Sequence, residues 1–174
     1  METHTLELYS DQPPVHIALF QNVTNTADLR KRLVQQDPTL SCALVNAALV
    51  INRTHALAAC NRAVHDHLNK QLKTHNIHSE IVFDFSPAIH IAQALRRFGI
   101  EDETQDVLVI KIGTTSEEAQ EFLQANIQGT LVSLDDLEKV RDLKRIKKYY
   151  QVGGTDDINT IFDLVMGAMA LKGI

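Results

Sequence analysis

The apolar positions of the chain recur with two spacings, which predict strands in some segments and helices in others. Residues 15–20 (VHIALF) place alternate apolar side chains on one face, which is typical of a strand. Leucines at helical spacing predict a helix that runs to about Gln36, with Asn25 or Thr26 as its N-cap. Residues 40–51 are apolar and fit either a strand or a helical turn. A stronger helix is predicted over residues 54–70, with Thr54 as its N-cap.

The middle of the chain predicts a β-α-β unit. Residues 81–85 (IVFDF) are typical of a buried strand, and Ser86-Pro87 then favours the start of a helix, because proline needs no amide partner in a first turn. Gly99 is expected to end this helix in a left-handed conformation, and residues 106–112 (DVLVIKI) predict the second strand. One face of the expected helix is apolar and consists of Ile91, Ala94, Leu95 and Phe98.

The last third of the chain is predicted to be mostly helical. A helix is expected from Ser116 to Gly129, followed by a short strand at residues 130–132 and a helical segment over residues 134–150. Gly153-Gly154 separates this segment from a final helix that starts near Asp156. The apolar residues of that final helix are Ile158, Ile161, Phe162, Val165, Met166 and Met169.

The order of these elements predicts an α/β fold with one small mixed β-sheet flanked by several helices. A length of 174 residues fits a single domain, for which residues 1–14 form a loose lead-in. The C-terminal helix is the element most available to a partner, because its apolar side chains extend over more than one face. Packing against the protein's own sheet explains the same pattern equally well.

Composition narrows the function classes. A net charge of −5 does not indicate a nucleic-acid binder, and an aromatic content of 5% without tryptophan disfavours a stacking surface for single strands. Cys42 and Cys60 lie among apolar residues and are expected to be reduced core thiols. No apolar run reaches the length of a membrane span, so we expect a protein of the cytoplasm and nucleus, without membrane partners.

No catalytic or metal-binding constellation is visible. His65 and His67 are two residues apart, which places them on different helix faces, and His75 and His78 have no cysteine or carboxylate at ligand spacing. We therefore expect most of the eight histidines to be solvated and one or two to lie in the core. A nucleophile elbow and a glycine-rich phosphate loop are both missing. The acidic pairs at residues 117–118 and 135–136 fit helix starts. We therefore expect neither an enzyme nor a cofactor.

The densest basic segment lies in residues 141–148. Its candidate phosphate contacts are Lys144, Arg145, Lys147 and Lys148. A solvated helix face is the preferred explanation of such a run over a phosphate contact, because basic runs are common and phosphate binding needs no sequence code. Arg30-Lys31-Arg32, Lys70, Lys73 and Arg96-Arg97 would add to the segment only where the fold brings them beside it.

Two motifs carry a family resemblance. The first is Ser86-Pro87 followed by Ile91-x-x-Ala94-Leu95 and Phe98-Gly99-Ile100, and the second is the helix Ala58-Ala59-Cys60-Asn61-Arg62-Ala63-Val64-His65. In this order and spacing they resemble the TPRKB family, over a stretch from about Val15 to the C-terminus. The final residues 171–174 (LKGI) are similar to the ends of fungal relatives.

The resemblance implies a non-catalytic accessory subunit of the KEOPS (EKC) complex. Such subunits bind and support the kinase-like ATPase PRPK, reach the other subunits through it, and help engage tRNA, including its 3′ CCA end. The complex makes N6-threonylcarbamoyladenosine beside the anticodon, and the family is also linked to telomeres. On this resemblance the C-terminal helix would bind the kinase, assisted by the helix over residues 54–70. The basic segment would bind tRNA.

Two other function classes stay open from the residues alone. A small enzyme could assemble a site from scattered residues, of which His65, Asp66 and His90 are the candidates. A free-standing RNA-binding module would bind tRNA without a protein partner, although the net negative charge and the few aromatic residues argue against it.

Overall fold

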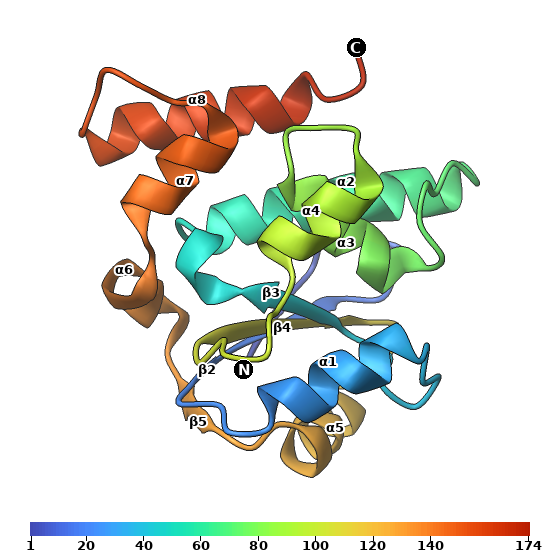
Figure 1. Cartoon of the computed structure of the whole chain (residues 1–174). Helices are drawn as coiled ribbons and strands as arrows, with labels where there is room; N and C mark the ends of the chain where they lie inside the picture. Colours follow the sequence, from blue (N-terminus) through green and yellow to red (C-terminus); the bar gives the residue numbers. More distant parts are fainter.

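The computed structural model describes residues 1–174 and contains one antiparallel five-stranded sheet between two layers of helices (Figure 1). The strands are β1 (Glu2–His4), β2 (Val15–Gln21), β3 (Ala43–Asn46), β4 (Val107–Ile112) and β5 (Thr130–Val132). They are ordered β1-β2-β4-β3, and β5 pairs with the end of β2 that β1 leaves free. The predicted α/β class is confirmed, but every strand pair is antiparallel, so the expected mixed sheet is wrong.

The helices cover both faces of the sheet. The α-helices are α1 (Thr26–Val34), α2 (Arg53–Leu68), α3 (Ile77–Phe85), α4 (Ile91–Phe98), α5 (Ser116–Asn126), α6 (Leu137–Val140), α7 (Leu143–Tyr150) and α8 (Ile158–Ala170), and short 3-10 turns are η1 (Glu7–Tyr9), η2 (Ala47–Leu49) and η3 (Leu134–Asp136). In Figure 1, α1 and α5 lie on one side of the sheet and α2, α3 and α4 on the other. Helices α7 and α8 lie beyond α2, farthest from the strands.

The segment predicted as the first strand of a β-α-β unit is instead helix α3. Asn76 and Ser79 form a reciprocal capping box at its start. Most of α3 is buried, because it packs against α2, α4 and β3, so its apolar side chains do not follow an amphipathic stripe. A short apolar run of this kind cannot be distinguished from a buried strand by its periodicity. The β-α-β unit is therefore replaced by two successive helices and strand β4.

The expected helix after Ser86-Pro87 begins later, at Ile91, where the His90 side chain accepts a hydrogen bond from the Gln93 amide. Gly99 is not left-handed: its φ is −77°, and it makes an isolated bridge to Val45 of β3. Glycine is needed there for a close contact, because a Cβ atom would lie 2.4 Å from the Leu95 carbonyl oxygen.

The N-terminal residues predicted as a loose lead-in are held in place. β1 pairs with β2 in register from Glu2 to His4, and Leu6 is buried. The Arg53 guanidinium lies 2.9 Å from Glu2 and 2.9 Å from Asp135, so it links β1 to α2 and η3.

Other boundaries differ by a few residues. The side chain that caps α2 belongs to Asn52, which accepts a hydrogen bond from the His55 amide, and not to Thr54. The expected helical segment over residues 134–150 is divided into η3, α6 and α7. The strand predictions at residues 15–20, 106–112 and 130–132 are confirmed by β2, β4 and β5.

The core has two parts, one on each face of the sheet. The larger part lies between the sheet and α2, α3, α7 and α8, and contains Cys60. The smaller part lies between the sheet and α1 and α5, and contains Cys42. Both cysteines are buried free thiols, as expected. Because both faces of the sheet are covered, β2 and β4 are apolar on both faces. No helix combines the length and apolar character that crossing a bilayer requires.

Candidate functional site

Helix α8 packs one stripe of side chains into the core. It begins after Asp157, whose carboxylate accepts a hydrogen bond from the Thr160 amide at 3.1 Å. Ile161, Val165 and Met169 are buried in the larger core, where α8 contacts α2 and α7. Three of the six residues predicted to contact a partner therefore belong to the interior of this chain.

The other residues of α8 leave an apolar surface on both flanks of that stripe. Ile158, Phe162 and Met166, also in the predicted set, are partly buried against the core. Leu164 and Leu171, on the opposite flank, are 48% and 66% exposed and were part of no predicted site. The sequence signal for them was weak, since it consists only of apolar residues outside the i, i+3, i+4 stripe.

A group of buried carboxylates lies beneath α8, between α2 and α3. Ligand oxygens of Asp66, Glu80 and Asp84 lie within 4.8 Å of one another. Asp66 pairs with Arg62 at 3.3 Å, and both oxygens of Glu80 accept backbone hydrogen bonds. Burial raises the pKa of the Asp84 carboxyl to about 7, although the nearby Lys172 ammonium opposes this rise. This group was not predicted, because Asp66 comes from α2, whereas Glu80 and Asp84 come from α3, a helix that was expected to be a strand.

The predicted basic segment forms helix α7, and basic side chains of α4 lie beside it. Lys144 and Lys148 are exposed, whereas Lys147 pairs with Asp156 at 2.8 Å. Arg145 lies over the Tyr149 ring at 5.7 Å from its centroid, and Arg97 of α4 lies over the same ring at 4.7 Å. The fold thus adds Arg97 to the segment. We call Lys144, Lys148, Arg145 and Arg97 the basic surface.

A cavity of about 710 Å³ lies between α1, α3, α4 and β3. Its apolar lining includes Leu33, Leu40 and Leu95. Arg30 and Arg96 also line it, and Arg96 is the neighbour of Arg97 in the basic surface. The sequence could not indicate this cavity, because its lining comes from segments that are distant along the chain.

Comparison with known proteins now identifies the family. The sequence profile described as "Kinase binding protein CGI-121" matches residues 20–173. The chain belongs to the CGI-121 family. It is 40% identical to the EKC/KEOPS complex subunit cgi121 of Aspergillus terreus, with 97% of this chain and 96% of that protein covered. It is 31% identical to the Schizosaccharomyces pombe protein of the same description, with 91% and 93% covered.

The family match extends to animals. The EKC/KEOPS complex subunit TPRKB of Danio rerio is 30% identical, with 99% of this chain and 98% of that protein covered. The resemblance to the TPRKB family is therefore confirmed over nearly the whole chain. Each of these three matches covers at least 91% of this chain and 93% of the relative.

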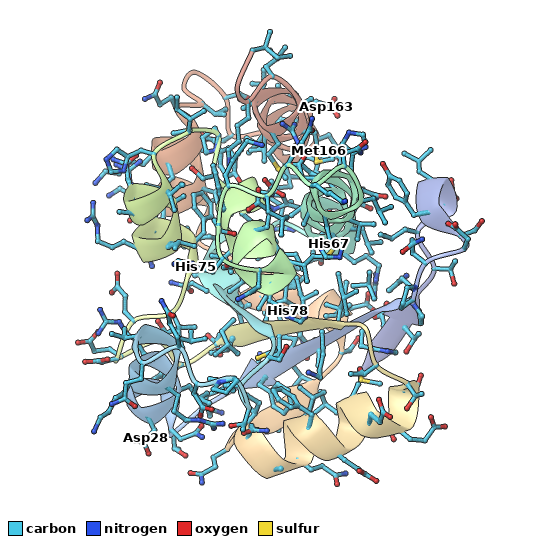
Figure 2. All side chains as sticks on the ribbon, turned by 90° about the vertical axis from the view of Figure 1, so that its right-hand side faces the viewer. Asp28, His67, His75, His78, Asp163 and Met166 are labelled. Atoms are coloured by element: carbon cyan, nitrogen blue, oxygen red, sulfur yellow. The ribbon has the colours of Figure 1, made fainter.

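The histidines of this CGI-121 family member have separate local roles. His16, His55 and His78 are buried, one more than the largest number expected. Figure 2 shows His78 between α3 and the sheet, where its Nε2 accepts a hydrogen bond from the Ile112 amide at 3.1 Å. His67 and His75 lie elsewhere on the surface (Figure 2).

The three residues considered as candidates for a small enzyme's site each interact with a different neighbour. His65 is exposed and hydrogen-bonds the Tyr9 hydroxyl at 2.7 Å, Asp66 pairs with Arg62, and His90 caps α4. An acid–base pair requires two groups within hydrogen-bond reach of one substrate proton. These three side chains form no hydrogen bond or ion pair with one another, so their geometry gives no support to that alternative.

Proposed function

We propose that this protein is a non-catalytic accessory subunit of the KEOPS/EKC complex that binds and supports the kinase-like ATPase PRPK. The support comes from two sources. The family is described as kinase binding, and curated relatives over the full chain length are described as EKC/KEOPS complex subunits. Contact with the remaining subunits would pass through the kinase, and the protein would act in the cytoplasm and nucleus.

The observation that carries the proposal is the surface of α8. One stripe of this helix holds it in the core, which fixes its orientation, and apolar side chains remain on both flanks. An exposed apolar patch on a fixed helix is typical of a protein interface. Methionine adapts its shape to a partner, and Met166 lies at the end of the molecule that α8 occupies (Figure 2). Helix α2, which contacts α8, would form the adjoining part of the interface.

Substitution of two leucines with nearly equal exposed fractions tests whether the surface of α8 binds the kinase. Leu164 of α8 is 48% exposed and Leu131 of β5 is 49% exposed. Leu164→Glu should weaken co-purification with PRPK and reduce the stimulation of its ATPase, because a charge would be buried at the interface. Leu131→Glu should leave both unchanged. Equal binding by both variants and the wild type would remove α8 from the interface.

We further propose that the basic surface engages tRNA, whose 3′ CCA end would enter the cavity beside Arg96. Lys144 and Lys148 are exposed and four residues apart, so both ammonium groups can face one phosphate backbone. The cavity has an apolar lining for bases and arginines for phosphates. These contacts would add to the tRNA binding of the kinase subunit. A chain with a net charge of −5 is not expected to bind tRNA tightly without such a partner.

Charge reversal tests the tRNA contact. Lys144→Glu with Lys148→Glu should weaken tRNA binding by the complex, and the slope of log K against log salt should fall by roughly one per lost phosphate contact. Lys70→Glu, two residues beyond the end of α2 and exposed, is the control for a single charge reversal away from the basic surface. An unchanged salt slope would exclude the two lysines. Tight tRNA binding by the isolated chain would instead favour the RNA-binding module.

A further inference from the structure

A second cavity, about 450 Å³, lies between α2, α8 and the N-terminal turn η1. Its walls are largely apolar and include Leu8, Ala58 and Met166. Its polar lining includes the acceptors Asn61 of α2 and Asp84 of α3, together with the cations Arg62 and Lys172. We call this cavity the α2–α8 pocket. It opens beside the flank of α8 that contains Met166, within the surface proposed to bind the kinase.

Two hydrogen-bond acceptors in the α2–α8 pocket have no donor. Asp84 is 6% exposed, and its buried Oδ2 has no hydrogen-bond partner. Asn61 Oδ1 is also buried without a partner, while its Nδ2 donates to the Leu57 carbonyl at 3.1 Å. That bond fixes the orientation of the amide, because the flipped amide would place two oxygens together. Buried acceptors without donors are costly, so an occupant should supply N–H groups.

The cations of this chain do not satisfy these acceptors. Arg62 is committed to Asp66. Lys172 donates to the Phe83 carbonyl and lies over the Phe83 ring, 3.3 Å from its centroid. Neither lies within 4 Å of the Asp84 carboxyl in an ion pair, so the buried Oδ2 of Asp84 has no direct cationic donor. The pocket consequently favours a further cationic donor from outside the chain.

A metal ion fits the group less well than an organic cation does. Lys73 Nζ lies 3.6 Å from Asp66, which also pairs with Arg62. Glu80 accepts hydrogen bonds from two backbone amides and from the Thr74 hydroxyl. Two of the three carboxylates are thus already occupied, and a divalent ion needs more free oxygen ligands than Asp84 and Asn61 provide.

We propose that the α2–α8 pocket receives one lysine or arginine side chain of the kinase subunit. The apolar walls would surround the methylene stem, and Asp84 and Asn61 would accept hydrogen bonds from the cationic head. This inference rests on the proposed function, because it names the chemistry of the partner at the same surface. It extends that function by predicting a buried, charge-assisted contact within an otherwise apolar interface.

Two variants of this chain test the shape and the charge of the pocket separately. Ala58→Leu fills the space, and Asp84→Asn removes the negative charge. Each should raise the Kd for PRPK, measured by calorimetry on the folded chains, by about tenfold or more, because a buried charged contact would be lost. The matched controls are Ala92→Leu on α4 and Asp28→Asn on α1, both exposed. Figure 2 shows Asp28 far from Met166, so the controls should bind as the wild type does.

The outcomes separate the two proposals. If the wild-type chain does not bind PRPK, the proposed function itself fails. If the wild type binds and both pocket variants remain within about twofold of its Kd, the interface is real but the pocket contact is overturned. Weakening by Ala58→Leu alone would indicate an apolar contact, which also overturns the cationic occupant.

Proton release gives a second measurement that a purely structural role would not produce. A cation beside Asp84 lowers the pKa of its carboxyl, so binding near neutral pH should release protons. Calorimetry in buffers of different ionisation enthalpy measures this release. It should occur with the wild type and disappear with Asp84→Asn. Equal release by the two proteins would contradict the proposed contact.

Discussion

His55 and Tyr150 form a buried hydrogen-bond relay that joins α2 to α7 and α3. His55 Nδ1 accepts from the Ile51 amide at 3.0 Å, which places the ring proton on Nε2, 3.0 Å from the Tyr150 hydroxyl oxygen. The Tyr150 hydroxyl then donates to the Phe85 carbonyl. Every polar atom of the relay is therefore satisfied without water, although both side chains are buried.

Removing the hydroxyl should destabilise the protein strongly. Tyr150→Phe leaves the His55 Nε2–H and the Phe85 carbonyl without partners, so we expect the free energy of unfolding to fall by about 1–3 kcal/mol. Tyr149→Phe is the control, since its ring contacts with Arg97 and Arg145 are retained. Urea denaturation of both variants measures the difference. Equal stability of the two would mean that the relay contributes nothing.

Stability should fall as the pH decreases from about 6 to about 4.5. Burial lowers the pKa of His55 to about 3 and that of His78 to about 4, so the unfolded chain, with histidine pKa values near 6.5, binds two more protons in this window. Asp84 acts in the opposite direction, because its raised pKa means that the folded chain binds one more proton. The net loss should be about 1.4 kcal/mol per pH unit.

The contribution of Asp84 to this pH dependence can be isolated. Asp84→Asn removes the opposing proton and should double the slope to about 3 kcal/mol per pH unit. The free energy of unfolding, measured in urea at several pH values, checks both slopes. An identical slope in the variant and the wild type would show that Asp84 does not take up a proton on folding.

Gly99 and Gly167 should respond to alanine in opposite ways. A Cβ at Gly99 would lie 2.4 Å from the Leu95 carbonyl oxygen, so Gly99→Ala should cost about 1–3 kcal/mol through displacement of the backbone. Gly167 lies within α8 and has open space around it, so Gly167→Ala should stabilise the helix by about 0.5–1 kcal/mol. Thermal unfolding of the two variants gives the comparison.

Two adjacent residues of α8, Leu164 and Val165, allow the contributions of surface and core side chains to stability to be compared. Val165 is fully buried and Leu164 is half-exposed, so Val165→Ala should cost about 1–3 kcal/mol and Leu164→Ala about 0.5 kcal/mol or less. Chemical denaturation tests this directly. Truncation that removes residues 155–174 would delete the buried stripe as well as the exposed surface of α8, and should therefore impair folding. Point substitutions on the exposed flank are the sharper test of partner binding.

Much of the fold followed from local patterns. The apolar segments of β2 and β4, the short strand β5 and the stripe of α8 were predicted because each pattern reflects the geometry of a single element. Helix α3 was not predicted, since a helix buried on most sides loses the polar face that would distinguish it from a strand. The β-α-β unit expected over residues 81–112 was wrong for the same reason.

The candidate binding surfaces could be predicted less well than the elements, because they depend on how the helices pack. The sequence indicated α8 and the basic residues of α7, but it could not say which side of α8 the core would cover. Nor could it place Arg97 over Tyr149, or Asn61 and Asp84 in one pocket, because these residues are far apart along the chain.

The sequence by itself indicated the family, the α/β class and the positions of β2, β4, β5 and α8, because motif spacing and periodicity are local properties of the chain. Only the tertiary structure decided that residues 77–85 are helical, that Ile161, Val165 and Met169 are core, and that Asp84 lacks a donor. The physical reason is that burial and hydrogen-bond satisfaction depend on neighbours from distant segments, which no local pattern specifies.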